Sequence, residues 1–214
     1  MDSESNNATS SSDQDTLKKL QDRIAEIMES YFKRVEENVT RVENLVALYR
    51  ALKQDSDFSR DPALDDILRA SVVFTHATLE DFLRTLATKL LPMADEETLN
   101  QIPLLNINTS GRPEKFLLGN LASFKEKTVE EVIQESVMNF LQRSNFNNIA
   151  DIVQLLKSLK VDVTKVNRSF STIEQLMERR HSIVHRADRK WLSGSKTSEL
   201  MDIDPADLVT WAGA

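Results

Sequence analysis

The feature that most constrains this chain is a long run of apolar residues near its start, spaced three and four positions apart. The run comprises Leu17, Leu20, Ile24, Ile27, Tyr31, Val35, Val42, Leu45 and Tyr49. This spacing places the apolar side chains on one face of a helix and the charged residues on the other. It therefore predicts a long amphipathic helix over roughly residues 15–53, whose apolar face needs other helices to cover it.

The same periodicity predicts the remaining helices. A second helix is expected over about 64–91, where Pro92 ends it, and further helices over about 128–143, 147–160 and 171–189. The chain has only 4 Gly and 5 Pro in 214 residues, so few tight turns are available, and no segment alternates as a strand does. The predicted fold class is all-α, a bundle of about five to six helices.

Composition divides the chain into three parts. Residues 1–14 are rich in Ser, Asn and Asp, and we expect them to form a disordered lead-in. Residues 15–190 are expected to form one helical domain. Residues 191–214 are expected to form a loop and the start of a C-terminal helix that the end of the chain truncates.

Charge and cysteine content restrict the classes of function. The chain has no Cys, which excludes disulfides and thiolate sites and fits a cytoplasmic protein. We expect no membrane association, because no apolar run approaches the roughly 20 residues that span a bilayer. The net charge of -7 argues against broad nucleic-acid coating, but residues 151–190 carry 9 basic and 5 acidic side chains. A single local basic site is therefore expected there.

The stretch ERRHSIVHR, residues 178–186, lies in this basic part and holds two of the three His. On a helical wheel Ile173, Met177, Val184 and Ala187 form an apolar stripe, and Arg180 falls in its middle. Because Arg cannot release its proton, a guanidinium on that stripe needs an acid, a bound anion or a groove between subunits. The ordinary alternative is an ion pair with an acid, and basic residues also favour helix C-termini.

A metal site is a further alternative for this helix. Glu178, His181 and His185 lie along one helix line, and two His separated by three residues are common ligands. However, no Glu stands between them as in HExxH zinc enzymes, and only His76 remains as another imidazole. The nearby arginines would also repel a cation. We therefore expect neither a metal nor any other cofactor.

Cleavage of RNA would use both residue types. The 2′-hydroxyl can attack the adjacent phosphate if a base takes its proton, an acid protonates the 5′-oxygen and positive charge stabilises the phosphorane. A histidine titrates near neutrality and can exchange protons, and an arginine offers a fixed fork of donors to phosphate oxygens.

The segment from Arg180 to His185 resembles the R-x4-H motif of HEPN-domain ribonucleases, and residues 76–87, HATLEDFLRTLA, look like the RiboL-PSP-HEPN branch. The resemblance implies a metal-independent endoribonuclease, an enzyme of toxin–antitoxin or phage-defence systems. It implies that Arg180 binds the phosphate, that His185 transfers the proton and that His181 assists. It also implies a homodimer with both motifs in one cleft, an RNA substrate and an antitoxin or other neutralising partner. Ala187 replaces a Tyr that some members carry.

Other residues have two interpretations each. Arg179, Arg186, Arg189 and Lys190 either follow the RNA backbone or form a solvated basic face. Glu80 either orients Arg180 or His185, or forms a local ion pair with Arg84 four residues later. The whole chain likewise has an alternative: a non-catalytic helical module that binds RNA or a protein through the basic helix.

Overall fold

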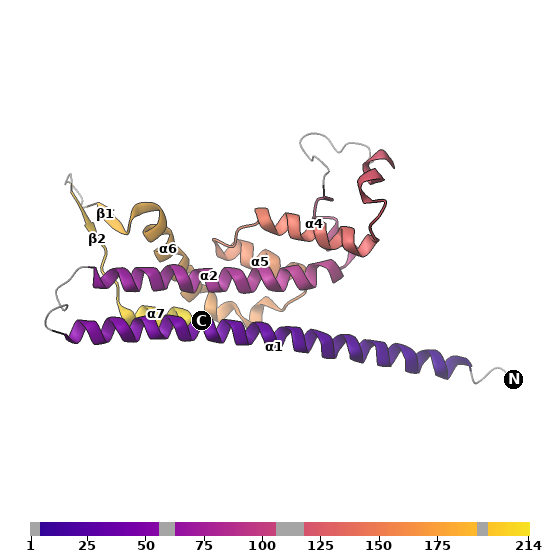
Figure 1. The fold of residues 1–214 in the computed structure, drawn as a ribbon, viewed down its shortest axis with the longest axis horizontal. Helices are drawn as coiled ribbons and strands as arrows, with labels where there is room; N and C mark the ends of the chain where they lie inside the picture. Colours follow the sequence, from indigo (N-terminus) through magenta and orange to yellow (C-terminus); the bar gives the residue numbers. More distant parts are fainter. Residues whose placement is uncertain (1–4, 56–62, 106–117, 192–196) are drawn as a thin grey trace.

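The computed structural model describes residues 5–55, 63–105, 118–191 and 197–214. Two long helices dominate it: α1, Ser5–Gln54, and α2, Leu64–Leu90, lie side by side and run in opposite directions (Figure 1). The N-terminal part of α1 extends beyond the other helices. Both helices have the length and type that the apolar periodicity predicts, apart from the start of α1.

The middle of the chain packs against the C-terminal half of α2. It contains α3, Glu96–Leu99, α4, Val129–Arg143, and α5, Ile149–Ser158, with the 3₁₀ helices η1, Leu91–Met93, and η2, Leu118–Phe124. Thr128 and Glu131 form a capping box that begins α4. One hydrophobic core joins α2, α4, α5 and α6, and includes Leu83, Ala87, Val137, Leu141, Ile152 and Met177.

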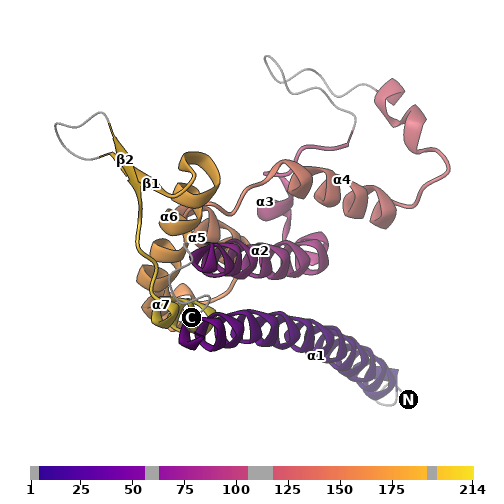
Figure 2. The ribbon, with the colours of Figure 1, turned by 60° about the vertical axis from the view of Figure 1, so that its left-hand side comes forward.

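The last part of the chain returns to the other end of α2. Two 3₁₀ helices, η3, Val163–Lys165, and η4, Asn167–Ser169, lead into α6, Phe170–Arg186. A short hairpin follows, in which β1, Arg189–Trp191, pairs antiparallel with β2, Ser198–Leu200, and the chain ends with α7, Pro205–Ala212 (Figure 2). A second core joins α1, α2, α6 and α7, and includes Val46, Leu68, Val72, Leu176, Leu208 and Trp211.

The helical fold class is confirmed, with seven α-helices among the described residues. No helix of the described residues has the length and apolar character that crossing a membrane requires. The hairpin corrects the expectation that the chain has no strand. Its strands of three residues are too short to produce a recognisable alternation.

Three helix boundaries differ from the expected ones. α1 begins at Ser5, so residues 5–14 are helical where a disordered lead-in was expected, and residues 1–4 lie outside the described part. α6 begins at Phe170 rather than at residue 171, and it ends at Arg186 rather than at residue 189. Ala187 and Asp188 adopt left-handed backbone conformations there, which end the helix.

Candidate functional site

The buried face of α6 is rotated relative to the predicted stripe. Leu176 and Met177 are its buried residues, and Ile173 and Ile183 are partly buried against the two cores. Val184 is 47% exposed, and Ala187 is exposed too. The helix therefore turns the side that carries Arg179 and Ile183 toward α2 and α7, and leaves Val184 at the surface.

Arg180 lies half-buried at the edge of this face. Its charge acts on the imidazole of His76, a residue of α2 that is 2% exposed. No hydrogen bond or ion pair joins Arg180 to an acid within the described ranges. The ion pair with an acid that was the ordinary alternative for Arg180 is therefore not formed within the described residues.

His76 is a buried imidazole that favours its neutral form. Burial lowers the pKa of His76, and the positive charge of Arg180 lowers it further, while Glu80 has a weaker opposite effect. A neutral imidazole next to a guanidinium avoids the repulsion of two positive charges. The lowered pKa of His76 therefore reflects both its burial in α2 and the charge of Arg180 on α6.

His181 and His185 are both exposed on the last two turns of α6. Their ring centroids lie 4.7 Å apart with the planes tilted by 45°. A polar hollow of about 520 Å³ adjoins His181 and Arg186. It is also lined by Glu174, Met177 and Glu178 of α6 and by residues 147–149 before and at the start of α5. Both imidazoles are thus accessible to a ligand from outside the chain, as proton transfer to a substrate requires.

Arg179 occupies the opposite environment from the one expected. Its side chain is 14% exposed, and its Nη2 donates to Asp188 Oδ2 at 2.8 Å and to the Met201 carbonyl at 3.2 Å. Burial lowers the pKa of Arg179, and nearby Arg69 adds to this effect, whereas Asp188 opposes it. Arg179 is held inside the protein, so the expectation that it follows an RNA backbone is corrected.

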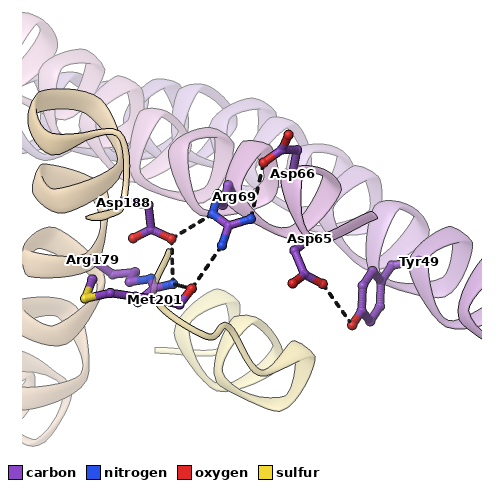
Figure 3. Close-up of polar contacts among 7 residues, drawn as sticks. All are labelled: Tyr49, Asp65, Asp66, Arg69, Arg179, Asp188 and Met201. Carbon is purple, nitrogen blue, oxygen red and sulfur yellow. Dashed lines mark hydrogen bonds and ion pairs between the residues drawn. The ribbon is translucent and has the colours of Figure 1, made fainter. Parts of the chain in front are cut away.

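Arg69 and Asp188 complete this buried ionic cluster (Figure 3). Arg69 Nε donates to Asp188 Oδ2 at 2.7 Å, and Arg69 Nη2 donates to the Met201 carbonyl at 2.9 Å. Asp66, which is 72% exposed, accepts from Arg69 Nη1 at 3.2 Å. Neither Arg69 nor Asp188 was predicted from the sequence to lie at the site. An Asp close to the end of a basic helix suggests a turn, but Arg69, the partner of Asp188, is 119 residues away in the sequence.

Glu80 forms the local ion pair that was the simpler of its two interpretations. Its Oε1 accepts from Arg84 Nη2 at 3.0 Å, and Arg84 also donates to the carbonyls of Leu141 and Ser144. Within the described residues no hydrogen bond or ion pair joins Glu80 to Arg180 or His185. Glu80 reaches the site only through its charge, which acts on His76.

The remaining basic candidates are at the surface. Arg186, Arg189 and Lys190 are exposed around the end of α6 and in β1. Arg189 Nη1 donates to the Ser198 carbonyl at 3.2 Å, across the hairpin. These three side chains and the two exposed imidazoles lie on the same terminal part of α6 and the strand that follows it.

Metal ligands do not gather at this site. In the residues that the structure describes, no group of three or more His, Asp or Glu side chains is arranged to hold a metal ion. Glu178, His181 and His185 follow one line of α6, as expected.

Comparisons with known proteins give one finding about the family. The model of the RiboL-PSP-HEPN family matches residues 36–203, which is most of the chain and includes α2, α6 and the hairpin. Neither the curated proteins nor the solved structures gave a match.

Proposed function

Because this chain belongs to the RiboL-PSP-HEPN family, we propose that it is a metal-independent endoribonuclease acting on single-stranded RNA. Its site consists of Arg180 and His185, with His181 in a supporting role. We place it in a toxin–antitoxin or phage-defence setting in a bacterial cytoplasm, where a neutralising protein is a further partner. The family assignment supports a role in RNA cleavage, and the imidazole and guanidinium groups of α6 support the mechanism.

The observation that carries this proposal is the environment of Arg180. It is half-buried, its charge acts on the buried imidazole of His76, and it has no acidic partner among the described residues. A guanidinium in this position is available to an anion, and it binds phosphate through paired donors. The neighbouring Arg179, by contrast, is already occupied by Asp188.

The chemical step needs one proton acceptor and one proton donor. A neutral imidazole removes the proton of the 2′-hydroxyl, whose oxygen then bonds to phosphorus, while an imidazolium gives a proton to the departing 5′-oxygen. Arg180 stabilises the negative charge of the phosphorane. The products are a 2′,3′-cyclic phosphate and a 5′-hydroxyl, so water does not enter the reaction.

A homodimer would supply two copies of each residue in one cleft. The exposed side of α6 carries His181, Val184 and His185, and Val184 is an apolar side chain that is 47% exposed. In a two-fold interface such a surface meets its own copy. Light scattering at micromolar concentration tests this part, and a strictly monomeric species would remove the composite cleft.

The test of activity is incubation of the purified protein with RNA in EDTA, followed by end-group analysis. Arg180→Ala and His185→Ala should each abolish cleavage, and His185→Ala should lower the rate by about 10²- to 10⁴-fold. Arg143→Ala, which removes an exposed guanidinium at the end of α4, is the matched control and should cleave normally. Cleavage that requires Mg²⁺ and leaves a 3′-hydroxyl would contradict the mechanism.

One observation favours the second candidate, a non-catalytic module that binds RNA or a protein. Within the described residues no carboxylate hydrogen-bonds to His181 or His185, although catalytic bases are commonly oriented by such a group. Expression in a bacterial host separates the two functions. A ribonuclease should impair growth, and His185→Ala should relieve the effect, whereas a binding module should do neither.

A further inference from the structure

Helix α6 ends in an unusual backbone conformation, directly after the motif. Ala187 and Asp188 both have positive φ, 50° and 56°, which side chains other than Gly adopt uncommonly. The Ser182 carbonyl accepts hydrogen bonds from the backbone N–H groups of both residues, at 3.0 Å for Asp188. Such a conformation persists only where surrounding contacts hold it.

Asp188 supplies those contacts. It is fully buried, and its Oδ2 accepts from Arg69 Nε of α2 at 2.7 Å and from Arg179 Nη2 of α6 at 2.8 Å. Its backbone carbonyl accepts from the Met201 N–H at 2.9 Å, just after β2. One residue therefore ties the end of α6 to α2 and to the returning strand of the hairpin (Figure 3).

The residues that these contacts hold, Arg179 and Asp188, lie close in the sequence to Arg180 and His185 of the motif. Arg179 immediately precedes Arg180, and Asp188 follows His185 by three residues. The His185 ring is exposed, and it lies against the ring of His181. The place of His185 is thus set by the backbone of the last turn, which Asp188 holds.

We propose that Asp188 and Arg69 are positioning residues, which fix the last turn of α6 against α2 and so set where His185 and Arg180 lie. The consequence for cleavage rests on the proposed function, but the consequence for the geometry of α6 does not.

The pattern of hydrogen bonds fits this role. Two guanidiniums from different helices share Asp188 Oδ2, whereas Asp188 Oδ1 and Arg179 Nε are buried without a partner among the described residues. A side-on pair with a single arginine would have used both carboxylate oxygens. The observed geometry instead joins two helices through one oxygen atom.

The test compares Asp188→Asn with the wild-type protein by two readouts, at a temperature where both are fully folded. The first readout is the ¹H–¹⁵N spectrum of the imidazoles, in which His181→Gln and His185→Gln assign the signals of the exposed rings. The second is cleavage of RNA under steady-state conditions. We expect the His185 signals to shift and broaden, and kcat to fall by about 100-fold, with KM changed little.

Leu141→Ala is the matched control. It removes a buried side chain of the core around α4 and should lower the melting temperature without altering the His185 signals or kcat per folded molecule. Arg69→Lys is the second variant, because it keeps the charge but cannot reproduce the fork that reaches Asp188 and Met201 together. If Asp188→Asn does not fold, Arg69→Lys decides the question, with the same expected direction.

The outcomes separate the two proposals. Unchanged His185 signals in the folded variants would overturn the positioning role, whether or not the protein cleaves RNA. If the His185 signals move in the variants but the wild-type protein does not cleave RNA, the proposed function is overturned and the positioning role stands.

Discussion

Arg69 Nε donates to Asp188 Oδ2 at 2.7 Å, and this contact joins the first turns of α2 to the second residue after α6. Both side chains are buried, with 8% and 1% of their surfaces exposed. The same arginine also contacts Asp66, an exposed acid in its own helix, at 3.2 Å. Arg69 thus has one buried and one exposed acidic partner, which provides an internal comparison.

Replacing each acid by its amide should have very different effects on stability. Asp188→Asn leaves Arg179 without its ion-pair partner and Arg69 with only the exposed Asp66, and it should lower the free energy of unfolding by about 3–5 kcal/mol. Asp66→Asn removes an exposed ion pair and should cost about 0–1 kcal/mol. Urea denaturation at pH 7 measures both, and equal losses would show that the buried carboxylate is not the main anchor.

Arg179 and Arg180 should respond to substitution in opposite ways. Arg179→Ala removes charge-assisted hydrogen bonds to Asp188 and Met201, so it should cost about 2 kcal/mol and lower Tm by roughly 4–8 °C. Arg180→Ala removes no ion pair in the described residues, so it should change Tm by at most about 2 °C while abolishing cleavage. A thermal melt and a cleavage assay on the two variants check this, and a large fall in Tm for Arg180→Ala would instead indicate a structural role.

The contrast between Arg179 and Arg180 shows which features of the structure could be predicted from the sequence and which could not. The apolar periodicity of α2 and α4 is local, so it predicted their type and approximate limits. The orientation of α6 depends on what covers it: packing against α7, which contributes Leu208 and Trp211, brings Leu176 and Ile183 inward and leaves Val184 outside. A helical wheel centred on Ile173 could not contain that information, and it placed Arg179 in solvent.

The Asp188 cluster was beyond sequence reasoning for a different physical reason. Its partners come from α2, α6 and the segment after β2, and they meet only because two successive residues turn the backbone into the left-handed region. Neither the turn nor the contact across 119 residues produces a periodic signal. His181 and His185 were easier to place, because both lie on one line of one helix.

His76 should make the stability of the protein fall below neutral pH. Its pKa is lowered in the folded state, first by burial and then by Arg180, so the unfolded chain binds a proton more readily. The contribution of neutral His76 is therefore complete above the unfolded pKa of 6.5 and is lost as the pH falls below it. The urea midpoint should fall between pH 7.5 and pH 5.5 by more in the wild-type protein than in His76→Gln.

His181→Gln is the control for that pH comparison, since it removes an exposed imidazole from α6 and leaves His76 in place. It should keep the pH dependence of the wild-type protein. A pH dependence that is the same in His76→Gln as in the wild type would assign the effect to other groups.

The exposed basic residues at the end of α6 should control how salt affects RNA binding. Arg186, Arg189 and Lys190 are exposed, and each phosphate contact on a single strand releases about 0.7 of a counterion. Replacing all three by Ala, in a His185→Ala background that prevents cleavage, should reduce the slope of log K against log salt concentration by about 2. Fluorescence anisotropy with a labelled single-stranded RNA at several salt concentrations measures this slope. The control replaces Lys33, Arg50 and Lys89, which are exposed on α1 and α2, and it changes the net charge by the same amount. An equal reduction in both triple variants would mean that the net charge of the protein, rather than contacts made by the end of α6, determines RNA binding.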